Sequence, residues 1–131
     1  MERRSVNPWP WSVNFGFQQA ELVDGASKVL YCSGQTSVDA EGNVQHAGDM
    51  GAQLALAFDN VEAVLADAGM TLANVVRVNV YTTDVDAFFA SYGGVAERLA
   101  AANVKMSSTL LGVSRLAFDG LMVEIEVTAV A

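Results

Sequence analysis

The spacing of apolar residues changes along the chain, and this change does most to constrain the fold. Between Asp49 and Ala68, apolar residues recur at steps of three and four, as on one face of an amphipathic helix. Asp49 is placed to cap this helix, and Gly69 is placed to end it. A second helix is expected over Asp84–Ala102, weakened in its middle by two consecutive glycines at 93 and 94.

Strand-like segments surround the two expected helices. Five are predicted, over residues 13–23, 27–35, 73–83, 107–116 and 121–130. The element order is therefore β-β-α-β-α-β-β, which indicates an α+β fold with a mixed sheet and two helices on one face. Two helices cover only one face of such a sheet, so we expect a partner subunit on the other.

Composition narrows the classes of function. The 131 residues suit a single domain spanning 1–131, and the net charge is −8 with seven scattered cations. Without a basic stripe, no nucleic-acid partner is expected. Cys32 is the sole cysteine and falls in an apolar strand, so it is expected to be an inert core residue. With no signal-like or membrane-spanning run, we expect a cytoplasmic protein without membrane contact.

The C-terminal stretch holds the residues of most chemical interest. In "VEIEV", Glu124 and Glu126 lie on one side of the alternation, about 7 Å apart. Ser107 and Ser108 stand where the preceding strand begins. These groups are either the edge of an active site or a solvated strand face with a polar start. His46, the only histidine, has no ligand set around it, so no metal is expected.

Several motifs together carry a family resemblance. The element order, "SGQ" (Ser33–Gln35), "VDAEGNV", the run from Asn60 to Phe88 and "VEIEVTA" (Val123–Ala129) resemble the RidA family, also called YjgF-like proteins. The resemblance covers the chain from about Gly16 to its end. It implies a chorismate-mutase-like fold assembled as a homotrimer, with the sheets forming a central barrel. It also implies ligand clefts between subunits.

The same resemblance implies an activity. Its best-known form in the family is hydrolysis of reactive enamines and imines to 2-keto acids and ammonia, with no metal or cofactor. Other members are binding proteins or specialised enzymes, so the fold leaves the function open.

Residues can be carried over from the family one position at a time. The arginine that grips the substrate carboxylate in deaminating members corresponds to Ser108, which supplies no charge. Lys105 is the nearest cation in the sequence. It lies three positions before Ser108, so its side chain would have to extend over that distance to replace the arginine. Glu124 matches the glutamate that positions or activates water. For Glu126 we favour a structural role.

Three further positions are expected to contact the ligand. Phe17 stands where many relatives have a cleft tyrosine, so the ring is kept and the hydroxyl lost. Gly34 either allows a ligand to approach the backbone closely or is a simple turn glycine at the end of a strand. Tyr92 stands near the position of a family asparagine and is either a cleft hydroxyl or a core or interface residue, of which we favour the latter.

The sequence and the resemblance together lead to three hypotheses about function. The first is an enamine or imine deaminase of altered specificity that acts through Glu124. The second is a small-molecule-binding or pathway-specific member without general deaminase activity, whose ligand is more apolar and not an anion. The third, a ribonuclease role reported for some relatives, is disfavoured by the acidic charge.

Overall fold

The central sheet has four strands in the order β3–β6–β4–β5. They are β3 (Val29–Tyr31), β4 (Val75–Thr82), β5 (Ser107–Gly112) and β6 (Val123–Val130). Strands β4 and β5 are parallel, and the other neighbours are antiparallel, so the sheet is mixed as predicted. This arrangement belongs to a computed structural model that describes residues 1–131.

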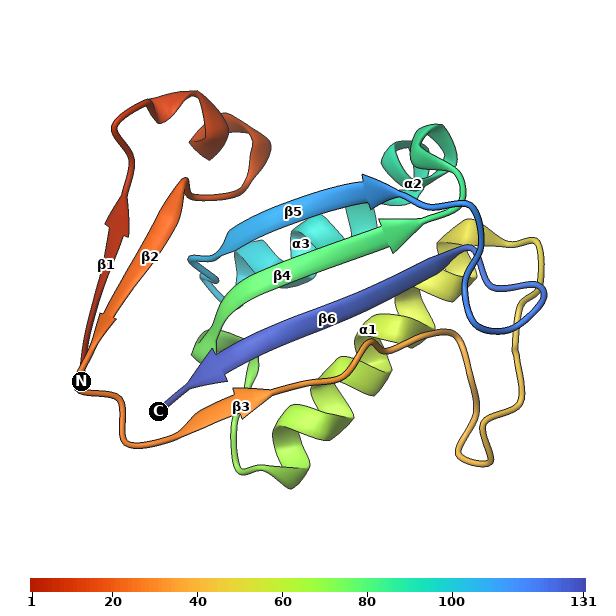
Figure 1. Ribbon diagram of the computed structural model, residues 1–131, viewed down its shortest axis with the longest axis horizontal. Coiled ribbons are helices and arrows are strands. Elements are labelled where there is room, and N and C mark those ends of the chain that lie inside the picture. The colour runs from red at the N-terminus through yellow and green to blue at the C-terminus, as the bar shows by residue number, and fades with distance from the viewer.

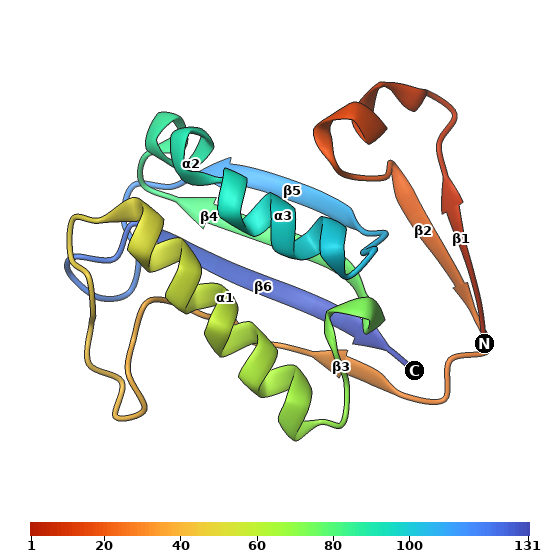
Figure 2. The ribbon, with the colours of Figure 1, turned by 180° about the vertical axis from the view of Figure 1, so that it is seen from behind.

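All three α-helices cover the same face of this sheet. Figure 1 shows the strands in front of the helices, and Figure 2 shows the helices in front of the strands. The helices are α1 (Met50–Asp67), α2 (Val85–Ser91) and α3 (Gly93–Ala101). The helix-facing side chains of β4 and β6 are buried, and those of the open face are more exposed. The expected one-sided cover is confirmed.

Helix α1 forms where its apolar period predicts it. The Asp49 carboxylate accepts a hydrogen bond from the Ala52 N–H at 3.1 Å, so the predicted cap is present. Gly69 follows the helix with φ +71°, a conformation that favours glycine. The apolar stripe is buried against the sheet through Leu54, Phe58, Val61 and Leu65.

An N-terminal hairpin stands apart from the central sheet (Figure 1). It pairs β1 (Glu2–Val6) with β2 (Ala20–Asp24), and the 3-10 helix η1 (Pro10–Phe15) lies between them. The predicted strand over 13–23 is therefore wrong in its first half, and β1 was not predicted. Pro10 opens the 3-10 helix because its fixed φ and missing N–H are tolerated there. Gly16, at φ +87°, then turns the chain into the segment that leads to β2.

The remaining predicted segments agree in type but differ in extent. The single helix over 84–102 is divided at Tyr92, directly before Gly93. The strand over 27–35 contracts to β3, followed by an isolated bridge between Gln35 and Ile125. The segment 73–83 begins with the short 3-10 helix η2 (Leu72–Asn74) and continues as β4. The two C-terminal strands are confirmed, the first ending at Gly112.

Two sequence expectations concern single features. Cys32 is 7% exposed within the core, and this burial raises the pKa of its thiol, which fits an inert core residue. Among the helices, none combines the length and apolar character needed to span a bilayer.

Candidate functional site

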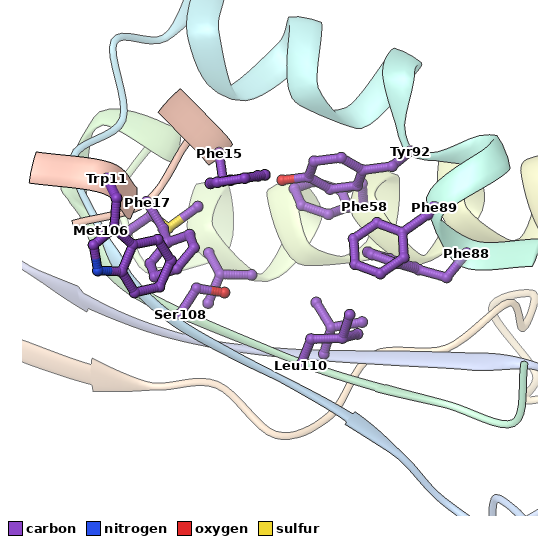
Figure 3. A pocket seen from close by; sticks show the side chains of 12 residues that line it. Trp11, Phe15, Phe17, Phe58, Phe88, Phe89, Tyr92, Met106, Ser108 and Leu110 are labelled. Atoms are coloured by element: carbon purple, nitrogen blue, oxygen red, sulfur yellow. The ribbon is translucent and has the colours of Figure 1, made fainter. Parts of the chain in front are cut away.

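An apolar pocket of about 440 Å³ opens between the helix face of the sheet, the helices and the N-terminal segment (Figure 3). Eleven of its twelve lining residues are hydrophobic, which suits a small-molecule site. The lining residues are Trp11, Phe15, Phe17, Phe58, Val78, Val80, Phe88, Phe89, Tyr92, Met106, Ser108 and Leu110.

Two groups of rings lie on either side of this pocket. The N-terminal aromatic group is Trp11, Phe15 and Phe17; the Trp11 ring meets Phe17 edge-on at 5.8 Å and Phe15 at 6.2 Å between centroids. The helical aromatic group is Phe88, Phe89 and Tyr92, which come from α2 and the junction that follows it. Figure 3 shows the two groups on opposite sides of the space, above Ser108 and Leu110. A planar ligand can therefore meet rings from both sides.

The N-terminal aromatic group is held in place by backbone contacts next to it. The Gln18 N–H donates to the Met106 carbonyl at 2.9 Å, which joins the segment to the residue before β5. The Arg3 guanidinium donates to the carbonyls of Ala73, Val75 and Lys105 at 2.7–3.0 Å. These bonds fix the hairpin beside the sheet although the two sheets are separate.

Two hydroxyl groups are the polar features of the pocket. In the parallel register Ser108 lies opposite Val78, so its side chain is on the helix face. Tyr92 directs its hydroxyl toward Phe15 (Figure 3). Burial raises the pKa of Tyr92, so this hydroxyl stays protonated and can donate at neutral pH. No charged side chain lines the pocket.

A second, polar pocket lies on the opposite face of the sheet. On β4 and β6, Tyr81 pairs with Glu124 and Asn79 with Glu126, whereas Val80 of the apolar pocket pairs with Ile125. The polar pocket measures about 260 Å³ and is lined by Gly34, Tyr81, Val113, Arg115, Leu116, Glu124 and Glu126. Within one protomer the sheet therefore separates Glu124 from Ser108.

The two glutamates of the polar pocket differ in their contacts. Glu126 accepts hydrogen bonds from the Tyr81 hydroxyl at 2.6 Å and from the Asn79 amide at 3.1 Å. These bonds lower the pKa of Glu126, Tyr81 contributing most. The Glu124 carboxylate accepts no hydrogen bond within the protomer, and it lies directly over Gly34. A Cβ at Gly34 would stand 2.6 Å from the Glu124 Cδ, so a larger residue there would force the Glu124 carboxylate to move.

The six residues predicted from the sequence thus fall into three places. Phe17, Ser108 and Tyr92 share the apolar pocket, and Gly34 and Glu124 share the polar one. Lys105 lines a third cavity, of about 550 Å³, which adjoins the apolar pocket through Phe15 and Tyr92. It does not line the pocket that contains Ser108.

Sequence reasoning missed several lining residues. For Trp11 and Phe15 the sequence shows only large apolar side chains that need other residues to cover them. Arg115 lines the polar pocket beside Glu124, from the loop that follows β5. Across the protein, His, Cys, Asp and Glu side chains form no group of three or more suited to a metal ion.

A family assignment follows from comparison with known proteins. Residues 17–131 match the model of the family described as Endoribonuclease L-PSP. The chain belongs to this family, which includes the RidA and YjgF-like proteins.

Individual relatives agree with the assignment. A RutC family protein of Aquifex aeolicus is 32% identical over 87% of both chains. The mitochondrial protein mmf1 of Schizosaccharomyces pombe is 35% identical over 79% of this chain, a region that makes up 63% of mmf1. The crystal structure of YyfB from Yersinia pestis, described as a protein of unknown function of the Rid family, is 32% identical over the full length of both chains, with a TM-score of 0.84.

Proposed function

We propose that this chain is a hydrolytic enamine or imine deaminase of altered specificity, which releases a carbonyl compound and ammonia. The observation that carries the proposal is the contrast between the two glutamates. Glu126 is held by Tyr81 and Asn79, whereas Glu124 lies over Gly34 with no internal donor. A carboxylate in that state is able to accept a proton from water.

The proposed reaction consumes one water for each ammonia released. Glu124 takes a proton from the water that attacks the C=N carbon and delivers it to the nitrogen, which gives a carbinolamine. Glu124 then takes the hydroxyl proton and returns it to the nitrogen as the C–N bond breaks. Ammonia leaves and the carbonyl compound remains, so the carboxylate acts as base and then as acid in both steps.

A homotrimer is part of this proposal, because the sheet separates Glu124 from the apolar pocket in one protomer. We propose that the cleft between subunits sets Glu124 of one chain against the apolar pocket of its neighbour. The open sheet face supports a partner there, since Tyr31 is 81% exposed and Leu111 is 49% exposed on it. Light scattering should give a trimer of 13.8 kDa chains, and a 13.8 kDa monomer would contradict the proposal.

The experiment follows hydrolysis of imines made in solution. An amino-acid oxidase produces 2-iminopropanoate from alanine, and an amine oxidase produces 2-phenylethan-1-imine from phenethylamine. Semicarbazide reacts with the imine faster than with the carbonyl product, so hydrolysis appears as a lower initial rate of semicarbazone formation. Glu124→Gln should lower the accelerated rate about 100-fold or more, and Glu126→Gln, the same change on the same strand face, should cost much less.

A second candidate is favoured by the apolar pocket itself. Its lining contains no cation, and Ser108 stands at the position that the family resemblance gives to a substrate-gripping arginine. This candidate is a protein that binds an apolar small molecule without catalysis. Binding of such a molecule, with no acceleration of either imine, would decide for it.

The charge of the chain argues against the ribonuclease activity in the family's description. The net charge of −8 and the scattered cations provide no track for a phosphate backbone. A reducing compartment such as the cytoplasm remains our prediction from the single cysteine.

A further inference from the structure

We propose that the apolar pocket selects an uncharged ring compound that carries one neutral polar group, such as a ketone, imine or amide, and that Trp11 and Phe15 determine this specificity. The inference names the ligand class of the site proposed above. It rests on the proposed function only in placing the ligand in this pocket, and it holds for a binding protein as well as for an enzyme.

The walls of the pocket suit a ring compound, and the pocket is large enough to admit one. A volume of about 440 Å³ lies within the range of ligand pockets. Rings of the N-terminal and helical aromatic groups face each other across it (Figure 3). Trp11 is 53% exposed, Phe15 is 72% exposed and Phe89 is 63% exposed. A ring bound between them would cover this apolar surface and make edge-to-face contacts on both sides.

The charge of the pocket selects against an anion. No lining side chain is ionised, and Lys105 lies on the adjoining cavity. A carboxylate that entered would lose its hydration without gaining a charged partner, which is costly in an apolar setting. The same cost does not apply to a neutral carbonyl or imine nitrogen.

The two hydroxyls supply the matching polar contacts. Neither the Ser108 nor the Tyr92 hydroxyl has a hydrogen-bond partner in the protomer, and both belong to the pocket lining. Each can donate to a neutral acceptor on the ligand. A ring with one such acceptor therefore satisfies both the apolar walls and the hydroxyls.

The test compares two probes that differ in one group. 1-Phenylpropan-2-one and phenylpyruvate share a skeleton, with a methyl in the first where the second has a carboxylate. Calorimetric titration of the full chain should give a dissociation constant about tenfold or more lower for the ketone. Ser108→Arg should reverse this order, because a guanidinium grips a carboxylate.

Variants of the N-terminal segment identify the residues responsible. Trp11→Ala and Phe15→Ala should each weaken ketone binding about fivefold or more, and Trp11→Phe, which keeps a ring, should retain most of the affinity. Trp9→Ala is the matched control, because Trp9 is 61% exposed and does not line the pocket. Circular dichroism checks that each variant is folded.

Several outcomes would overturn the inference. They are equal or tighter binding of phenylpyruvate by the unaltered chain, equal effects of Trp11→Ala and Trp9→Ala, and a pocket filled by a side chain of a second copy with no ketone bound. Ketone binding that follows the predicted order, in a protein that hydrolyses no imine, supports this inference and contradicts the catalytic proposal. Hydrolysis restricted to 2-iminopropanoate does the reverse.

Discussion

Gly34 is the residue whose replacement reports most specifically on Glu124. The Glu124 side chain occupies the space that a Cβ at Gly34 would need, with its Cγ 2.8 Å from that position. Gly34→Ala should therefore displace the carboxylate and lower imine hydrolysis about tenfold or more. Gly51→Ala is the control, because a Cβ there meets nothing closer than 3.8 Å. An unchanged rate in folded Gly34→Ala would show that the position of Glu124 over Gly34 does not matter for the reaction.

Glu126 gives a prediction about pH. Hydrogen bonds from Tyr81 and Asn79 lower its pKa, so the ionised form is favoured in the folded state. The stabilisation is present above the unfolded pKa of about 4.3 and is lost as the pH falls through the lower folded value. Tyr81→Phe should raise the pKa of Glu126 toward its ordinary range. Its stability deficit should be constant near neutral pH and should narrow in acid.

Carboxyl NMR titration and urea unfolding at several pH values measure these two effects. Tyr31→Phe is the matched control, since Tyr31 lies on the same open sheet face and its hydroxyl makes no hydrogen bond in the protomer. A Glu126 pKa that is the same in Tyr81→Phe and in the unaltered chain would contradict the assigned cause.

At the level of residues, the sequence predicts part of the site. Phe17, Ser108 and Tyr92, which the family resemblance selects, line one pocket, and their role in ligand binding stays a prediction. Trp11 and Phe15 escape prediction because their partners are distant in sequence. The position of these two rings depends on how the N-terminal hairpin is fixed to the central sheet. The spacing of apolar residues along the chain does not predict that arrangement.

At the level of elements, the glycine pair explains why the second helix is divided. Gly93 and Gly94 begin α3, and a Cβ added at either position would have no neighbour within 4 Å. Gly94→Ala should therefore raise the free energy of unfolding by about 0.5–1 kcal/mol. Gly69→Ala should lower it, because φ +71° strains any other residue. Urea unfolding at fixed protein concentration measures both, and destabilisation by Gly94→Ala would contradict the explanation.

Arg3 gives a prediction about the N-terminal hairpin. Its guanidinium donates to three carbonyls where β4 and β5 begin, and its loss should loosen the segment that carries the N-terminal aromatic group. In Arg3→Ala the Gln18 amide should exchange about fivefold to tenfold faster, equivalent to about 1 kcal/mol. Arg4→Ala, an exposed neighbour without such bonds, should leave exchange unchanged. Equal protection in both variants would show that Arg3 does not hold the hairpin.

The elements predicted best are those whose period is long and regular. Helix α1 and strands β4 and β6 repeat their pattern over several turns or pairs, so tertiary context adds little. The strand predicted over 13–23 is wrong in its first half because an imperfect alternation of large apolar residues does not distinguish a strand from a 3-10 turn that presents rings to one side. Pro10 gave the available signal for that turn.

At the level of the whole molecule, the central sheet separates the two pockets that hold the candidate functional residues. The apolar pocket lies on its helix face and Glu124 lies on its open face, so one protomer holds the two halves of the proposed site apart. Only an assembly can bring them together. In the proposed assembly the relation between the two halves depends on a second chain, so residue patterns within one chain do not give their relative placement.

A crystal structure of the assembled protein with 1-phenylpropan-2-one bound tests this proposal most directly. We expect a trimer with the phenyl ring between the N-terminal and helical aromatic groups of one chain, and the ketone carbon facing Glu124 of its neighbour at a distance that one water can bridge. An assembly in which Glu124 faces no aromatic pocket of any chain, with the ketone bound elsewhere or not at all, would contradict it.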